Sequence, residues 1–174
     1  ASAGRIEVLR GPSSSLYGNA GGGVVAIHSI PGATGEWRIR PSLIVGSHGL
    51  RRTQLGVSGG NTRHRLSVNI RRLQLDGYRD HSESLVRGAG IIGHHRLSDR
   101  WQLTSVLNIY DAPYLLNPSS MNREDAETRP RYARGFVVSQ GASKVARQVQ
   151  GGFTLRHEAG PTRSEVTLFG VDRS

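Results

Sequence analysis

The segment HRLSVNIR, residues 64–71, decides the fold class of this chain. Apolar side chains occupy every second position in the middle of it, and hydrophilic side chains fill the positions between. Because successive side chains of a β-strand point to opposite faces, this period of two predicts a strand with one apolar and one hydrophilic face. The apolar set is Leu66, Val68 and Ile70, and the hydrophilic set is Ser67, Asn69 and Arg71.

Six further segments around this one have strand character and are separated by clusters of Gly, Asn, Asp and Pro. All seven are longer than the five or six residues usual for strands in soluble proteins. A strand of about 9–11 residues can cross a bilayer in a barrel. Two architectures remain open: a transmembrane barrel with a wet lumen, and a soluble antiparallel sheet with one solvated face. The predicted strands cover residues 37–47, 51–59, 64–75, 85–97, 101–111, 143–157 and 164–172.

Short and long connections between these segments alternate, apart from a short first connection at 48–50, as periplasmic turns and extracellular loops do in outer-membrane barrels. With the short turns on the inner side, Trp37 and Trp101 are expected at the inner interface and Arg72 and Arg147 at the outer one. Pro41 predicts a bulge or an unpaired edge, since it donates no ladder hydrogen bond. The short connections are 60–63, 98–100 and 158–163, and the long ones are 76–84 and 112–142.

Composition limits the possible classes of protein. The 174 residues contain no cysteine, which excludes a disulfide scaffold and thiolate metal sites. The longest apolar run, Val24 to Ile27, is far shorter than the ~20 residues of a membrane-spanning helix. Residues 1–10 lack the apolar region of a signal peptide. The net charge of +10 suggests an anionic partner, but the arginines are spread along the chain without a nucleic-acid motif.

The first 35 residues differ from the rest, with short strand-like segments on either side of turns rich in Gly, Pro and Ser. No Lys follows the glycines, as a phosphate-binding P-loop requires. Residues 6–18, IEVLRGPSSSLYG, resemble the signature that ends the plug domain of TonB-dependent outer-membrane receptors, and residues 22–27 resemble a following GGVINI segment. Looser similarity to this family continues at 46–52, 76–82 and 97–101.

This resemblance implies an all-β fold, in which the C-terminal part of a plug domain, residues 1–35, precedes about seven strands of an antiparallel transmembrane β-barrel, residues 36–174. The barrels of such receptors have 22 strands. The chain is therefore expected to be a fragment, with the signal peptide and the TonB box before it. The implied function is the binding and active import of a scarce ligand, such as a ferric siderophore, across the outer membrane of a Gram-negative bacterium. The implied partners are the TonB complex, that ligand and outer-membrane lipid.

The resemblance also suggests roles for particular residues. Glu7 and Arg10 are expected to join plug and barrel through ion pairs. The motif positions with a structural or plug–barrel role are Glu7, Arg10, Gly11, Pro12, Tyr17, Gly18, Gly22 and Gly23. The candidates for ligand contact in the loops are Tyr78, Arg79, His81 and Tyr114.

Other charged clusters have simpler interpretations. Four arginines in the long loop lie among acidic residues, which predicts a solvated loop whose charges pair with one another. His94 and His95 fall on opposite faces of one strand and cannot hold one metal together. We expect no catalytic residues, no cofactor and no metal. The loop arginines are Arg123, Arg129, Arg131 and Arg134, and the acids are Glu124, Asp125 and Glu127.

Two alternatives remain open beside the receptor hypothesis. A soluble basic β-protein could bind nucleic acid or another polyanion, and its binding would then depend strongly on salt. A soluble β-enzyme could act on an anionic substrate, which requires titratable groups to converge in a pocket.

Overall fold

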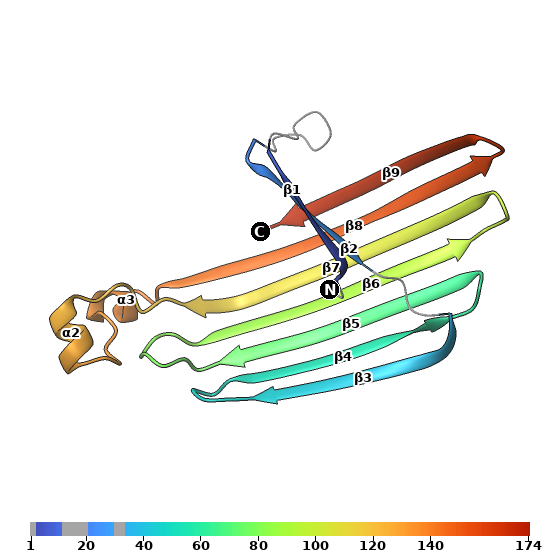
Figure 1. Ribbon diagram of the computed structural model, residues 1–174. Helices are drawn as coiled ribbons and strands as arrows, with labels where there is room; N and C mark the ends of the chain where they lie inside the picture. Colours follow the sequence, from blue (N-terminus) through green and yellow to red (C-terminus); the bar gives the residue numbers. More distant parts are fainter. Residues whose placement is uncertain (1–2, 12–20, 30–33) are drawn as a thin grey trace.

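The computed structural model describes residues 3–11, 21–29 and 34–174, and over these residues the protein is all-β apart from two short helices (Figure 1). Strands β1 (Ala3–Arg10) and β2 (Gly23–Ser29) form a two-stranded antiparallel sheet. Seven more strands form a second sheet in which each strand is antiparallel to the next. They are β3 (Gly35–Val45), β4 (Arg51–Gly60), β5 (His64–Leu75), β6 (Ser84–Arg96), β7 (Trp101–Leu116), β8 (Ser143–Ala159) and β9 (Thr162–Arg173).

The seven strands predicted from the period of two are confirmed, and every boundary except the end of β7 agrees with the prediction within two residues. Strand β7 runs to Leu116, five residues beyond the predicted end at Asp111. Its pairing with β8 shifts register between Ala112 and Leu115. This irregularity accommodates Pro113, so the strand continues past the proline instead of ending there. The connection from β8 to β9 is also shorter than predicted, because only residues 160 and 161 lie between the strands.

The seven-stranded sheet is open, with β3 and β9 as its two edges. The amide of Gly46 donates to the Leu50 carbonyl, and Val45 pairs with Arg51. The main-chain groups of even-numbered β3 residues therefore form the hydrogen bonds to β4, and the nitrogen of Pro41 faces the unpaired side. The prediction that Pro41 marks an unpaired edge is confirmed, and this proline costs the ladder no hydrogen bond.

The register places apolar side chains in rows across one face of the sheet, called here the apolar face. Few of these side chains are covered; Trp37 is 58% exposed and Leu168 is 70% exposed. The central row consists of Ile39, Val57, Val68, Ile91, Leu107, Gly151 and Gly170.

Both ends of the apolar face have a different composition. At the end where β5 finishes, Arg72, Arg87, Asp111 and Arg147 lie in one cross-strand row. Trp101 marks the opposite end, where its ring lies 4.2 Å from that of His157. The predicted placement of Trp37 and Trp101 at one end, and of Arg72 and Arg147 at the other, is therefore confirmed for the sheet.

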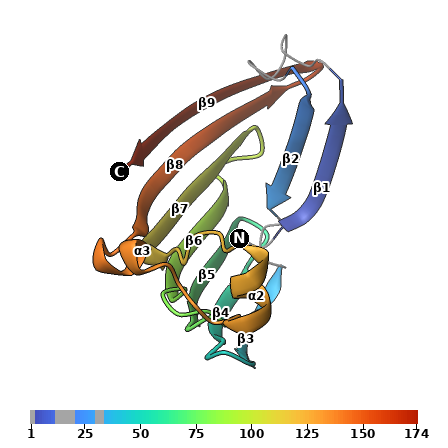
Figure 2. The same cartoon turned by 90° about the vertical axis from the view of Figure 1, so that its left-hand side faces the viewer.

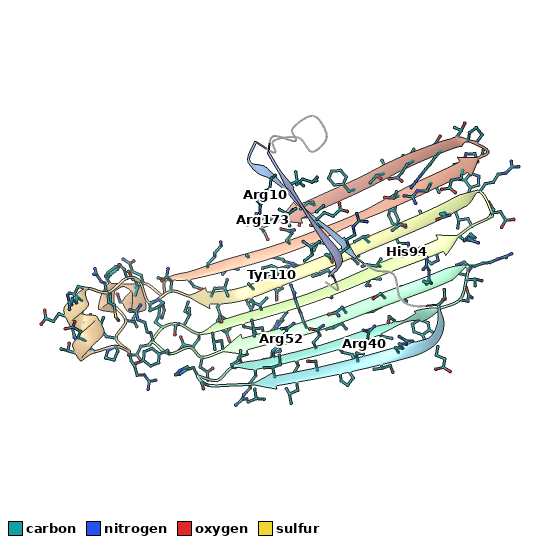
Figure 3. All side chains as sticks on the ribbon, in the orientation of Figure 1. Arg10, Arg40, Arg52, His94, Tyr110 and Arg173 are labelled. Atoms are coloured by element: carbon teal, nitrogen blue, oxygen red, sulfur yellow. The ribbon has the colours of Figure 1, made fainter. Side chains whose placement is uncertain are left out.

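The opposite face, called here the polar face, is concave and is the side on which β1 and β2 lie (Figures 1 and 2). Figure 3 labels side chains of this face on five strands: Arg40, Arg52, His94, Tyr110 and Arg173. Two acids of this face, Glu158 and Glu165, each pair with an arginine of the neighbouring strand, Glu158 with Arg163 of β9 and Glu165 with Arg156 of β8. Arg40, Arg71 and Arg173, by contrast, form no ion pair with any described residue.

Four of the five buried apolar side chains among the described residues gather at the end of the sheet where the long connection folds, and the fifth, Ile92, lies farther along β6. Leu85 begins β6 and Ala112 lies near the end of β7, and both are buried. Ala133 and Val137 in the connection are buried too. This connection contains the helices α2 (Arg123–Thr128) and α3 (Gly135–Ser139). The protein therefore has its small core under the loops, and most of the sheet is one layer thick.

Candidate functional site

Three connections meet at the end of the sheet drawn at the left of Figure 1, and we call residues 46–50, 76–83 and 117–142 the loop cluster. The amides of Asp76 and Gly77 both donate to the His48 carbonyl at 3.0 Å, which joins the first two connections. The amide of Asp80 donates to the Arg131 carbonyl at 2.8 Å, which joins the second to the third. The main chain alone therefore links the three connections into one structure.

Arg79 is the centre of this cluster. Its guanidinium donates to the carbonyls of Tyr132, Ser119 and Pro118, at distances from 2.6 to 3.2 Å. These acceptors lie on two segments of the long connection, about a dozen residues apart, so the planar fork of the arginine holds both segments at once. In this structure Arg79 organises the loops, and the prediction that it contacts a ligand stays a prediction.

The other predicted ligand residues lie in or beside the same cluster. The Nε2 of His81 lies 2.9 Å from the Ala142 carbonyl; because a carbonyl only accepts, this nitrogen carries the proton. The ring of Tyr78 lies edge-on to that of His48, with 5.2 Å between centroids, and Tyr78 is 48% exposed. Tyr114 is half-buried at the irregularity of β7 and pairs with Leu85. The structure brings Tyr78, Arg79 and His81 together, and Tyr78 remains the most accessible of the three.

Two of the four arginines of the long connection pair with acids of the same helix, as predicted, whereas Arg131 and Arg134 form no ion pair with any described residue. Arg123 pairs with Glu127 at 2.8 Å, and Arg129 pairs with Asp125. The hydrogen bond to Asp125 also raises the pKa of Arg129. The Arg129 guanidinium lies over the ring of Tyr132, 4.3 Å from its centroid. Arg123 and Arg129 are therefore engaged within the loop.

Backbone conformation is strained at one residue in each of the three connections. His48, His81 and Ser119 have φ of 57°, 58° and 66°, and they are the non-glycine residues with positive φ among the described residues. Non-glycine side chains disfavour this region, and such residues often cluster at functional sites. The sequence contains no signal for them, because His and Ser usually adopt negative φ.

A second candidate site is a hollow of about 210 Å³ on the polar face, called here the polar groove. A Cβ at Gly88 would lie 2.9 Å from Nε of Arg71, and one at Gly90 would lie 3.1 Å from Oδ1 of Asn108. The two glycines thus leave the space that these side chains occupy. The groove is rich in donors suited to carboxylate, phosphate or carbonyl oxygens. Its polar lining is Asn69, Arg71, Asn108, Tyr110 and Gln148.

Sequence reasoning missed the polar groove, although its signals are present. Gly88 and Gly90 occupy positions of the polar phase in β6, where the neighbouring strands carry Asn69 and Asn108. The amide side chains lie beside the glycines because of the register between the strands, and this register could not be predicted from the sequence.

The motif residues that the structure describes lie on the β1–β2 hairpin. Glu7 pairs with Arg5 on the same face of β1. Arg10 is exposed and forms no ion pair with any described residue. Gly23 has φ of 134°, and a Cβ there would lie 2.6 Å from the Leu9 carbonyl oxygen, so this position requires glycine. Gly11, with φ of 94°, and Gly22 are described as well, whereas Pro12, Tyr17 and Gly18 lie outside the described residues.

The two adjacent histidines of β6 are arranged as predicted. His94 and His95 do point to opposite faces: His94 lies 3.1 Å from Oγ1 of Thr104, and His95 contacts His64. In the described part of the chain, three or more His, Asp or Glu side chains nowhere come together as a metal site.

Comparison with known protein families found no family model that matches this chain. Within the described ranges, no helix is both long enough and apolar enough to cross a membrane.

Proposed function

We propose that this chain is part of a TonB-dependent outer-membrane receptor that binds and imports a scarce ligand such as a ferric siderophore. In this proposal β3–β9 are a section of the wall of a transmembrane β-barrel, and β1–β2 belong to a plug inside its lumen. The loop cluster faces the cell exterior, where it contributes to ligand capture. The observation that carries the proposal is the apolar face, a continuous exposed band on a sheet whose opposite face is polar and concave.

The dimensions of this band support a bilayer as its environment. Trp101 and Ile109 bound its apolar part on β7, and the eight residue-to-residue steps between them extend about 27 Å at ~3.4 Å per step. A strand tilt of about 40° reduces this to about 21 Å, close to the roughly 25 Å apolar band of outer-membrane barrels. The band has a tryptophan at one border, as in the aromatic girdles of such barrels, and charged residues at the other, where a charge near the interface costs only about 0–1 kcal/mol.

The open edges support a barrel that contains further strands. In lipid, unpaired main-chain groups cost several kcal/mol each, so only a closed sheet is stable there. Strands β3 and β9 each have one unpaired side. We therefore expect neighbouring strands to cover both edges in the receptor.

The absence of cysteine makes a direct test of the orientation straightforward. Residues 66 to 71 of β5 are replaced one at a time by cysteine, labelled with an environment-sensitive fluorophore and reconstituted in lipid vesicles. Labels at Leu66, Val68 and Ile70 should emit as in lipid, and labels at Ser67, Asn69 and Arg71 as in water. Water-like emission from all six positions would refute the membrane orientation.

Transport is tested separately from orientation. Cells that produce the receptor should take up iron from at least one of a panel of radiolabelled ferric siderophores, and the uptake should stop when TonB is deleted. TonB-independent uptake, or no uptake and no binding of any of the chelates, would refute the assigned activity while leaving the membrane orientation in place.

The second candidate function is a soluble protein that binds nucleic acid or another polyanion, and the unpaired arginines of the polar face favour it. Such binding should weaken steeply with salt, because released counterions drive it. The exposed apolar face argues against this candidate, since a monomeric soluble protein rarely leaves so large an apolar patch uncovered. Salt-insensitive or absent binding to single- and double-stranded DNA and RNA would eliminate it.

A further inference from the structure

The rings of His64 and His95 face each other on neighbouring strands, on the apolar face at the end of the sheet opposite the loop cluster. His64 begins β5, His95 lies near the end of β6, and the two residues are direct cross-strand partners. Their Nδ1 atoms are 3.1 Å apart, and the ring centroids are 5.3 Å apart. His64 is exposed and His95 is half-buried, so solvent reaches the pair.

This separation matches the distance between two nitrogens that bind one metal ion. Imidazole nitrogens bind Zn²⁺ and similar ions at about 2.0–2.1 Å. Two such bonds at an angle of about 90–110° place the nitrogens roughly 2.9–3.4 Å apart. A ring rotation that turns both lone pairs toward one point would therefore form a two-nitrogen site without moving the backbone.

The local structure fixes the main chain at His64 and leaves room for the ring of His95. The Oδ1 of Asn61 accepts hydrogen bonds from the amides of Arg63 and His64 at 2.9 and 2.7 Å, and the amide of Asn61 donates to the His64 carbonyl at 2.7 Å. The ring of His95 lies over Gly93, where a Cβ would be 2.9 Å from its Nε2. A rigid turn fixes one ligand, and a glycine leaves room for the other.

Within the strands, the charges nearest the pair lie on the opposite face, and Arg63 in the turn before His64 is the further charge nearby. Arg65 and Arg96 each neighbour one of the two histidines along the chain, so their side chains point to the polar face. On the apolar face, the next partners across the strands are Gly93 beside Leu66, and Leu103 beside His95. A divalent ion at the pair would meet uncharged neighbours on its own face.

We propose that His64 and His95 form a solvent-accessible two-histidine site for a divalent transition metal, with water completing the coordination. Imidazole ligands suit copper, nickel and zinc, and among these ions Cu²⁺ binds such sites most tightly. The site depends only on the pairing of β5 with β6 and does not require the proposed receptor function.

The test is Cu²⁺ binding to the untagged protein in detergent, followed by titration and by electron paramagnetic resonance. The wild-type spectrum should show coupling to two imidazole nitrogens. His64→Ala and His95→Ala should each show one nitrogen and bind roughly 10²-fold more weakly, because the second ligand no longer acts intramolecularly. His157→Asn is the matched control, because it removes a histidine from the same end of the same face. It should change neither the two-nitrogen spectrum nor the Cu²⁺ affinity.

A further variant tests the geometry while keeping both histidines. Gly93→Ala places a methyl group against the ring of His95, so it should weaken Cu²⁺ binding while circular dichroism shows the β-structure retained. Equal affinity of the wild type and of His95→Ala, or a single-nitrogen spectrum for the wild type, would overturn the proposal. If every variant that loses Cu²⁺ binding also loses its β-structure, the proposal is overturned as well, because the loss would then reflect unfolding and not removal of a ligand.

Discussion

At the scale of single residues, Arg79 is the side chain on which the loop cluster depends most. Its carbonyl partners lie on two segments of the long connection that no other described side chain joins in this way. Hydrogen bonds from a charged donor contribute about 1.5–3 kcal/mol each when formed in partly buried places. Arg79 therefore sets how firmly residues 117–142 are held.

We predict that Arg79→Lys releases the long connection. Lysine keeps the charge but has no planar fork, so it cannot reach Tyr132 and Ser119 together. The free energy of local opening should fall by about 2 kcal/mol, which makes amide hydrogen exchange in residues 117–132 roughly 30-fold faster. Arg123→Lys is the control, because this exposed arginine pairs with Glu127 four residues away and with no other acid in the described part of the chain. Equal exchange in both variants would contradict the assigned role.

A glycine in the first connection allows a second prediction. Gly49 has φ of 71°, and a Cβ there would overlap the carboxylate of Asp76. Gly160 has a similar φ of 59° but has open space around it. Gly160→Ala should lower the free energy of unfolding by about 1 kcal/mol, because of backbone strain alone. Gly49→Ala should lower it by about 1–2 kcal/mol more, because of the added overlap.

Unfolding by urea in one detergent measures both costs. Adding Asp76→Ala to Gly49→Ala should recover most of the additional loss, since it removes the overlapping group. If the double variant is no more stable than Gly49→Ala, the overlap is not the cause.

At the scale of elements, the strands could be predicted because the sequence carries two kinds of signal for them. A period of two sets the faces, and Gly-, Asn- or Pro-containing turns set the ends, as at β5, whose bounds agree at both ends. The end of β7 could not be predicted, because Asp111 and Pro113 usually break strands. Here a register irregularity accommodates Pro113, and Asp111 lies 3.7 Å from Arg87 of β6.

The candidate site was predictable to a lesser degree. The resemblance pointed to residues 76–82, and the structure does place Tyr78, Arg79 and His81 in one cluster. The sequence could not reveal that the Arg79 guanidinium donates to carbonyls 39 to 53 residues away, since such contacts depend on how the long connection folds back.

The two faces of the sheet give a prediction that belongs to the strands. In vesicles, Val68→Arg puts a charge in the central apolar row and should lower the free energy of unfolding by about 2–4 kcal/mol. Thr53→Arg lies on the same face in the row of Arg72, where the cost should be about 0–1 kcal/mol. Ser67→Arg, on the polar face, is the control. Equal destabilisation by all three would contradict a lipid-facing apolar face.

At the scale of the whole molecule, the charge of +10 is distributed unevenly. The middle of the apolar face carries no charge, whereas Arg40, Arg71 and Arg173 lie on the polar face without an acidic partner among the described residues. The hairpin β1–β2 lies on that same side (Figure 2). Much of the positive charge therefore lies on the concave side of the sheet, the side on which the β1–β2 hairpin lies (Figure 2).

The open edge of β9 determines how the isolated chain behaves. Arg147 and Ser174 exchange two main-chain hydrogen bonds, at 2.9 and 3.0 Å, so even-numbered residues of β9 bond to β8 and odd-numbered residues face outward. Such a row of unpaired amides and carbonyls is a template for another strand. On the opposite edge, Pro41 already removes one outward donor.

We therefore predict that the chain self-associates in detergent through β9 and that one proline can prevent it. Val171→Pro removes an outward amide, as Pro41 does on β3, and should shift the sedimentation profile toward the monomer while hydrogen exchange in β8 stays slow. Leu168→Pro is the matched control: its amide faces β8, so it should make exchange in β8 and β9 fast. If Val171→Pro associates as the wild type does, β9 is not the contact. If neighbouring strands cover this edge in the receptor, Val171→Pro should instead destabilise the complete barrel, because the lost donor would then have had a partner.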